Sequence, residues 1–166
     1  GVAPALVAFN WALSALGKPG WAAAFLYVAG AALRLARFNT QAASSDNRFF
    51  RGLASPAAAA LLASLVWTAT DFGLVREKLP FVVAVIAAVL TAGAGVLMVS
   101  NFRYHSFKKF DFRRRVPFVI ILLPVLVIGV VSLDPPRILL LMAIVYALSG
   151  PSQFLLQRRS RRTKSP

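Results

Sequence analysis

Two arginines, Arg34 and Arg37, are the residues of this chain best suited to bind an anion. They belong to the segment Arg34-Leu-Ala-Arg-Phe-Asn39, and Gly30 precedes Arg34 by four positions, so a helix would put all three on one face. A guanidinium group can contact phosphate or carboxylate through two parallel hydrogen bonds, and a glycine beneath it would leave space for a ligand headgroup. The alternative is a pair of arginines whose charged ends snorkel to a membrane interface, and the spacing alone leaves both open.

Two further segments combine aromatic, polar and basic residues. The first, from Phe49 to Pro56, joins an aromatic pair to a Gly-Leu-Ala-Ser-Pro turn. Taken alone it is typical of an ordinary helix entry, since proline is tolerated in the first turn of a helix. The second, from Ser100 to Lys108, interleaves aromatic residues with bases, as segments at a membrane interface do. We expect His105, which lies in it, to be an interfacial side chain rather than a catalyst.

Six apolar runs must position these segments. They cover residues 1–16, 19–33, 53–70, 79–102, 116–133 and 138–157. Most approach the roughly 20 residues that a helix needs to cross about 30 Å of hydrocarbon. The predicted fold is all-α: a polytopic integral membrane helical bundle with about six transmembrane helices in residues 1–157, followed by a basic cytoplasmic tail at 158–166.

Basic residues gather in every second gap between these runs. Fifteen of the 19 Lys and Arg residues lie after residue 33, after residue 100 or at the C-terminus, and four lie in the other gaps. Short loops rich in Lys and Arg stay cytoplasmic, so we expect an integral protein of the cell (inner) membrane whose active face is cytoplasmic. The net charge of +14 would suggest nucleic-acid binding in a soluble chain. Between apolar runs it indicates topology and attraction to anionic lipid instead, and we expect no nucleic-acid partner.

Metal and thiol chemistry lack the residues they need. The chain has no cysteine, one histidine and five acidic residues, namely Asp46, Asp71, Glu77, Asp111 and Asp134. The first apolar run is also short, because 16 residues of helix cover only about 24 Å. We therefore expect the first helix to begin upstream of Gly1.

Three segments, in this order, resemble the CDP-alcohol phosphotransferase family, and within it the serine-using branch of CDP-diacylglycerol–serine O-phosphatidyltransferases. They are Arg34-Leu-Ala-Arg-Phe-Asn39, Phe50-x-Gly-Leu-x-Ser-Pro56 and Ser100-Asn-x-Arg-Tyr-x-Ser-Phe-Lys108. The start of the chain, Gly1 to Ala5, also resembles the stretch that follows the family's catalytic signature. The resemblance covers nearly all of the chain except its tail. Ala54 departs from it, because this branch usually carries proline before the Ser-Pro pair.

The resemblance implies transfer of a phosphatidyl group from CDP-diacylglycerol to L-serine, giving phosphatidylserine and CMP. It also implies a divalent cation, Mn²⁺ or Mg²⁺, held by aspartates of the signature D-x2-D-G-x2-A-R-x8-G-x3-D-x3-D, one of which would deprotonate serine. None of the five acidic residues matches that spacing, and two-metal chemistry needs converging carboxylates. We therefore expect neither a catalytic residue nor a metal ligand in this chain, a signature upstream of it, and no activity of this chain alone.

The expected substrate-binding residues share one cytoplasmic level: Arg34, Arg37, Asn39, Arg51, Tyr104 and Lys108. The first two would contact phosphate or the serine carboxylate, the next two would close the rim, and the last two would lie in the headgroup region. The expected partners are CDP-diacylglycerol, L-serine and membrane lipid, and a homodimer is among the oligomeric states that the sequence leaves open. Two alternatives remain: another acceptor such as glycerol phosphate, inositol phosphate or choline, or a non-enzymatic transporter or partner subunit. A transporter would be expected to carry ionisable residues near mid-membrane, and none of the five acids lies there.

Overall fold

The computed structural model describes residues 1–41, 50–100, 103–104 and 118–162, some of them by their backbone alone. Its helices within these ranges are α1 (Val2–Trp11), α2 (Lys18–Gln41), α3 (Ser55–Asp71), α4 (Phe81–Val99), α5 (Phe118–Leu133) and α6 (Pro135–Arg162). Two short 3₁₀ helices, η1 (Leu13–Leu16) and η2 (Arg76–Lys78), precede α2 and α4. Strands β1 (Phe50–Arg51) and β2 (Arg103–Tyr104) pair in antiparallel fashion. The predicted helical fold is confirmed, with this small strand pair added to it.

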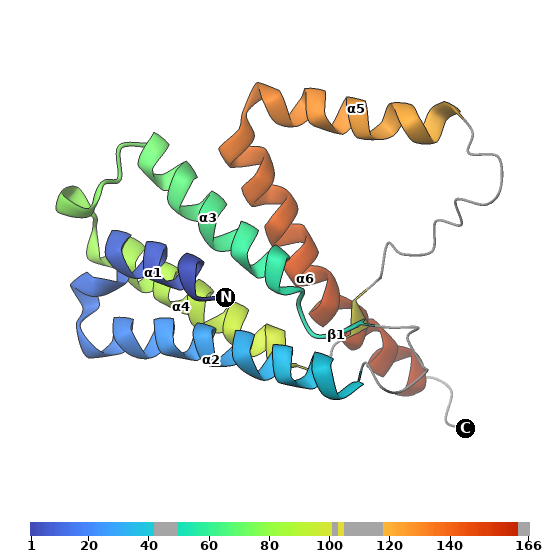
Figure 1. Ribbon diagram of the computed structural model, residues 1–166, viewed down its shortest axis with the longest axis horizontal. Helices are drawn as coiled ribbons and strands as arrows, with labels where there is room; N and C mark the ends of the chain where they lie inside the picture. The colour runs from blue at the N-terminus through green and yellow to red at the C-terminus, as the bar shows by residue number, and fades with distance from the viewer. Residues whose placement is uncertain (42–49, 101–102, 105–117, 163–166) are drawn as a thin grey trace.

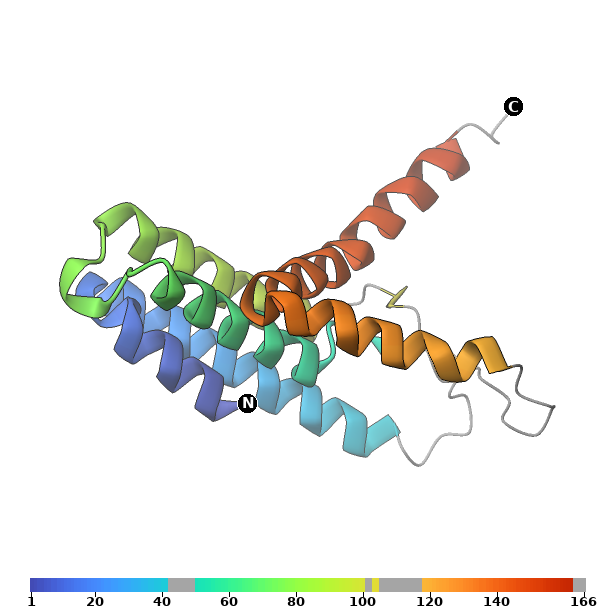
Figure 2. The same ribbon diagram turned by 90° about the horizontal axis from the view of Figure 1, so that it is seen from above.

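The helices form a bundle in which α2 and α4 lie side by side and run in the same direction (Figure 1). Helix α1 packs against α2 and α3, and α6 covers α3. Helix α5 contacts α6 and leaves it at a bend of 118° (Figure 2). The C-terminal ends of α2 and α4, the N-terminal end of α3 and the strand pair lie together, and we call this region the motif end.

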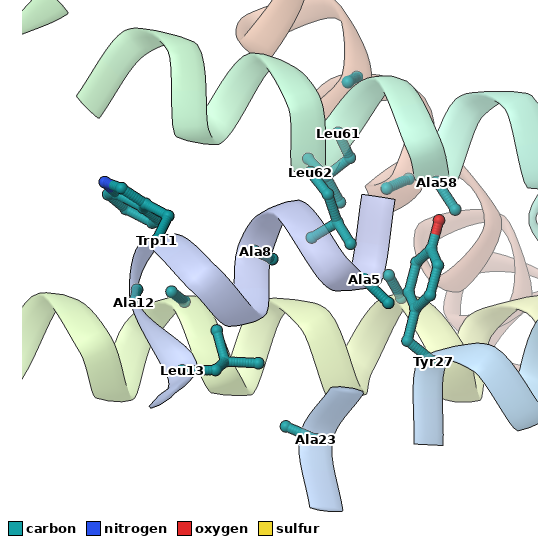
Figure 3. Packing of buried hydrophobic residues seen from close by; sticks show 14 of the residues in the cluster. Ala5, Ala8, Trp11, Ala12, Leu13, Ala23, Tyr27, Ala58, Leu61 and Leu62 are labelled. Carbon is teal, nitrogen blue, oxygen red and sulfur yellow. The ribbon is translucent and has the colours of Figure 1, made fainter. Parts of the chain in front are cut away.

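Small residues bring the helices of the bundle close together. Gly30 of α2 packs on Gly95 of α4, where a Cβ on Gly30 would collide with the Gly95 carbonyl oxygen. A Cβ on Gly95 would in turn lie 2.7 Å from the Leu26 carbonyl oxygen. Around this crossing the core is rich in alanine, with Tyr27 among its few large side chains (Figure 3). Close backbone approach of this kind is how helices associate in lipid.

The outer surface of the bundle is apolar. Large side chains that are exposed there include Trp21, Phe25, Phe81, Val89 and Ile128, and the rings of Trp21 and Phe25 stack on each other. A water-soluble monomer rarely exposes this much contiguous apolar surface. The surface fits a hydrocarbon surrounding, and the chain is a helical membrane protein.

The number of membrane-spanning helices differs from the prediction. Among the described residues, two helices are long and apolar enough to cross a membrane, Lys18–Thr40 with 23 residues and Phe81–Val99 with 19. The bent pair Val125–Leu133 and Pro135–Ser152 would make a third if it counts as one span. Six transmembrane helices are therefore not supported, in part because several of the apolar runs fold into helices shorter than 18 residues. Helix α3, for example, has 17 residues and α5 has 16.

The first and last helices also have bounds that differ from those of the predicted apolar runs. The first apolar run is not one helix: α1 stops at Trp11, whose indole N–H donates to the Leu74 carbonyl oxygen at 2.8 Å, and η1 follows. At the other end α6 remains helical to Arg162, past the boundary predicted at residue 157. Residues 163–166 of the predicted tail lie outside the described residues.

Helix α3 has clear start and stop signals. Pro56 stands in its first turn, where a missing backbone N–H costs nothing. At its end Gly73 adopts a φ of +75°, which glycine reaches without strain. The N–H groups of Gly73 and Leu74 donate back to the carbonyl oxygens of Thr70 and Ala69, in the pattern of a Schellman cap. These signals fix where Ser55, the first residue of α3, meets the motif end.

Candidate functional site at the motif end

Arg34 connects α2 to the beginning of α3. It is half-buried, and its Nη1 donates to the Ser55 hydroxyl oxygen at 2.9 Å. Its Nε is buried and has no hydrogen-bond partner in the part of the chain that the structure describes. Tyr146 of α6 is close enough to interact with Arg34 electrostatically. The side chain thus lies where α2, α3 and α6 meet, and its buried Nε–H has no partner among the described residues.

Arg37 connects α2 to the end of α4. Its Nη1 donates to the Val99 carbonyl oxygen at 3.2 Å, and Val99 is the last residue of α4. Carbonyl groups in the last turn of a helix have no partner within the helix and carry its negative dipole end, so a guanidinium group is well placed there. Arg37 therefore has a structural role in addition to the substrate contact that the sequence suggests.

The Gly52 turn packs on the same end of α4. Gly52 has a φ of +85°, and a Cβ there would collide with the Met98 carbonyl oxygen. The next residue, Leu53, is fully buried, and its backbone N–H donates to the Leu97 carbonyl oxygen at 3.0 Å. Glycine is required here both for its backbone conformation and for lack of space. The segment is the helix entry that it resembled, since α3 begins at Ser55, and it also packs closely on the end of α4.

The strand pair joins the second and third segments singled out in the sequence. Its register places Phe50 opposite Tyr104 and Arg51 opposite Arg103. This positions the backbones of Arg51 and Tyr104, two of the predicted substrate-binding residues, at the motif end; their side chains are not described. Lys108 and His105 lie outside the described residues. Three segments that are far apart in the sequence therefore meet at one end of the bundle (Figure 1).

Two predicted features of α2 have a different setting from the one expected. Gly30 does lie on the face of Arg34, but the Gly95 backbone fills the space beside it. The prediction that this glycine leaves space for a ligand headgroup is wrong, because the space serves the crossing of α2 and α4. Asn39 is exposed near the end of α2, and its offset from Arg37 turns it to another face of the helix. Its proposed place at the rim stays a prediction.

Sequence reasoning missed Tyr27. This side chain is fully buried, and its hydroxyl has no hydrogen-bond partner among the described residues. It precedes Arg34 by seven positions, which is two turns of one helix face. The spacing of Tyr27, Gly30 and Arg34 is visible in the sequence, and it would have been the signal to follow.

Among the described residues, the motif end offers hydrogen-bond donors suited to an anion rather than a set of metal ligands. Among the described residues, no carboxylate forms an ion pair with Arg34. The ion pairs that the structure shows there join Asp71 and Asp134 to Arg137, at the other end of α3. No group of three His, Cys, Asp or Glu side chains in the described part of the chain could hold a metal ion. These described residues do not fit a divalent cation. What they offer is a guanidinium group with a buried, available N–H.

Comparisons with known proteins agree with the resemblance seen in the motifs. No protein-family model matches the chain. Two curated CDP-diacylglycerol–serine O-phosphatidyltransferases from different strains of Helicobacter pylori are 33% and 32% identical to it over 153 residues. The match covers 89% of this chain and 60% of each relative, so the chain spans about three fifths of their length. Over most of its length, the chain is therefore similar to CDP-diacylglycerol–serine O-phosphatidyltransferases, as its three segments predicted.

Proposed function

We propose that the full-length protein containing this chain transfers a phosphatidyl group from CDP-diacylglycerol to L-serine. In this reaction the serine hydroxyl oxygen attacks the phosphorus that bears diacylglycerol, and a new P–O bond forms. The P–O bond to the CMP portion breaks, CMP leaves with the bridging oxygen, and the serine hydroxyl proton passes to a base. The reaction belongs to phospholipid biosynthesis, and the printed names of the two relatives support it.

The observation that carries the proposal is the convergence of the three segments at the motif end. Arg34 donates to Ser55, Arg37 donates to Val99, and the strands Phe50–Arg51 and Arg103–Tyr104 pair. A purely interfacial arginine pair would extend toward lipid headgroups and would need no such internal partners. The contacts favour a built polar site over simple snorkelling.

The two arginines have different roles in this proposal. Arg34, with a buried Nε that is available as a donor, contacts the anionic group of a substrate. Arg37 helps to fix the end of α4 and supplies positive potential to the same region. Asn39 and Arg51 at the rim, and Tyr104 and Lys108 near the headgroup, remain additional proposed contacts. The basic loops predict that this end faces the cytoplasm and works on lipid in the inner membrane.

The test is CMP release from CDP-diacylglycerol by the full-length protein in detergent micelles. Assays with and without L-serine, each with and without Mn²⁺ or Mg²⁺, would show serine- and metal-dependent release if the proposal holds. Glycerol phosphate, inositol phosphate and choline serve as competing acceptors. If CMP is released with one of these acceptors and not with L-serine, the proposed acceptor changes to that compound. A folded protein that releases CMP with none of them would contradict the proposal.

A further inference from the structure

The Tyr27 hydroxyl is an unusual group for its surroundings. It projects from α2 toward α3 in the interior of the bundle, where Ala5 and Ala58 are its neighbours (Figure 3). The side chain is 0% exposed, and its oxygen has no hydrogen-bond partner among residues 1–41, 50–100, 103–104 and 118–162. Buried polar atoms in folded proteins nearly always have partners, and an unpaired hydroxyl is costly away from water. Phenylalanine would fill the same space without that cost, so the hydroxyl calls for an explanation.

Arg34 lies on the same face of α2, two turns toward the motif end. Its partner Ser55 and the neighbour of Tyr27, Ala58, are three positions apart on α3, so the two α2 side chains face successive turns of one α3 surface. At this level Ala58 is the fully buried residue of α3, and Ala5 of α1 lies beside it (Figure 3). Two α2 side chains whose buried polar atoms have no partner among the described residues therefore face neighbouring turns of α3.

Both groups can donate hydrogen bonds. The Arg34 Nε carries one N–H, and a tyrosine hydroxyl donates one O–H. No acidic side chain lies with them among the described residues, so an ammonium group would find no anionic partner there. A carboxylate, by contrast, has two oxygens that accept from both donors and a charge that the guanidinium group neutralises.

We propose that the Tyr27 hydroxyl and the Arg34 Nε form one subsite that binds the carboxylate of the hydroxyl-bearing acceptor. The inference rests on the proposed function, and it makes Tyr27 a specificity-determining residue. Acceptors with a carboxylate gain the tyrosine contact, whereas acceptors such as ethanolamine cannot use it. The unpaired hydroxyl is then paired when the acceptor is bound.

The test replaces Tyr27 by phenylalanine in the full-length protein, which removes one oxygen and keeps the ring. We expect the KM for L-serine to rise at least tenfold, the KM for CDP-diacylglycerol to stay within twofold, and the melting temperature to hold or rise. The preference for L-serine over ethanolamine should fall by a similar factor. A KM for L-serine within twofold of the wild-type value, in a folded Tyr27→Phe protein, would overturn the inference.

Thr68→Val is the matched control. The Thr68 hydroxyl is likewise buried and has no partner in the described part of the chain, but Thr68 lies about 20 Å along α3 from Ser55. Its removal tests whether loss of any unpaired buried hydroxyl changes the kinetics. We expect the KM for L-serine to be unchanged in this variant. An equal rise in both variants would contradict a specific role for Tyr27.

A second readout separates failure of the subsite from failure of the proposed function. If the wild-type protein releases no CMP with L-serine, the proposed function fails. The subsite is then decided by thermal shifts with L-serine and with 3-hydroxypropionate, which keeps the hydroxyl and carboxylate but lacks the ammonium group. A shift in the wild-type protein that Tyr27→Phe abolishes would support the carboxylate subsite. If neither compound shifts the melting temperature of the wild-type protein, the carboxylate subsite is overturned.

Discussion

The two ends of α3 each meet an arginine from a neighbouring helix, but the partners differ. At the C-terminal end of α3, Arg137 of α6 lies 2.8 Å from an Asp134 oxygen and 3.5 Å from an Asp71 oxygen. The same guanidinium group lies 4.7 Å from the centre of the Phe72 ring. At the N-terminal end of α3, Arg34 of α2 donates to a neutral hydroxyl on Ser55, and its buried Nε has no partner within the described ranges.

This difference separates an arginine that holds helices together from one that can also bind a ligand. Two carboxylates and an aromatic ring already neutralise and surround Arg137, and its side chain is half-exposed. Arg34 has no carboxylate partner among the described residues, so its charge is not compensated there. A cation that is half-buried without an acid is costly in a membrane protein and marks a functional site by default. The comparison therefore supports the proposed binding role of the motif end and a structural role for the other end.

The largest expected effect comes from Arg34→Ala in the full-length protein. Loss of a hydrogen bond to a charged group costs about 1.5–3 kcal/mol, which corresponds to a fall in kcat/KM for L-serine of about 10- to 150-fold. Arg137→Ala should change the same ratio less than threefold. Measurement of CMP release at varied L-serine gives both values. Equal losses in the two variants would remove the distinction between the two ends.

Arg34→Lys sharpens this test, because it keeps the charge and loses the planar set of donors. A lysine ammonium group is a point charge and cannot reproduce a contact made through Nε and Nη1 together. We expect only partial recovery, with kcat/KM between the Arg34→Ala and wild-type values. Full recovery would mean that charge alone accounts for the role of Arg34.

The next effect tests the helix crossing beneath the motif end. In Gly95→Ala the new methyl group would lie 2.7 Å from the Leu26 carbonyl oxygen, so α2 and α4 must separate. Overpacking of this kind costs about 1–3 kcal/mol. Gly93→Ala is the matched control in the same helix, because nothing lies within 4 Å of its added Cβ. Unfolding in detergent should show a destabilised Gly95→Ala and an unchanged or stabilised Gly93→Ala; equal stability of the two variants would contradict the close crossing.

The sequence predicts which face of α2 carries the polar residues but not what that face meets. The spacing of Gly30, Arg34 and Arg37 correctly predicts one shared face, because 3.6 residues per turn is a local property. That Gly30 meets Gly95 depends on which helix lies beside α2, and a single sequence does not contain that information. For the same reason, the sequence alone does not show which helices surround Tyr27.

The packing face of α4 shows a second limit. Alanines at every fourth position, Ala84, Ala88 and Ala92, predict a face that packs against other helices. Only Ala84 of the three is buried, and the buried face continues through Ala87 and Thr91. Residues spaced strictly four apart drift around the helix, because one turn takes 3.6 residues. Residues that stay on one face are therefore spaced three and four apart in alternation. The sequence thus predicted that α4 packs through small residues, but it identified the face imprecisely.

A smaller effect is expected from Ser55→Ala, which removes the oxygen that accepts from Arg34. A hydrogen bond to a charged group contributes about 1.5–3 kcal/mol, but this bond only orients Arg34, which would keep its charge and its Nε. We expect kcat/KM for L-serine to fall less than in Arg34→Ala. Ser64→Ala on the same helix is the control, because the Ser64 hydroxyl donates only to carbonyl oxygens of its own helix, those of Ala60 and Leu61. A loss in Ser55→Ala as large as that in Arg34→Ala would mean that Arg34 acts only by holding α3.

The smallest effect is expected at the opposite end, in the stability of Arg137→Ala. Exposed ion pairs contribute about 0.2–1 kcal/mol each, and salt screens them. The two carboxylate contacts of Arg137 are half-exposed, so the free energy of unfolding should fall slightly at low salt and by less at high salt. The comparison variant Arg34→Ala should instead lose activity with a much weaker dependence of its stability on salt, because its partner is a neutral hydroxyl. A large, salt-independent loss of stability in Arg137→Ala would show that this end is more than a surface ion-pair cluster, and that its arginine is as tightly built into the bundle as Arg34.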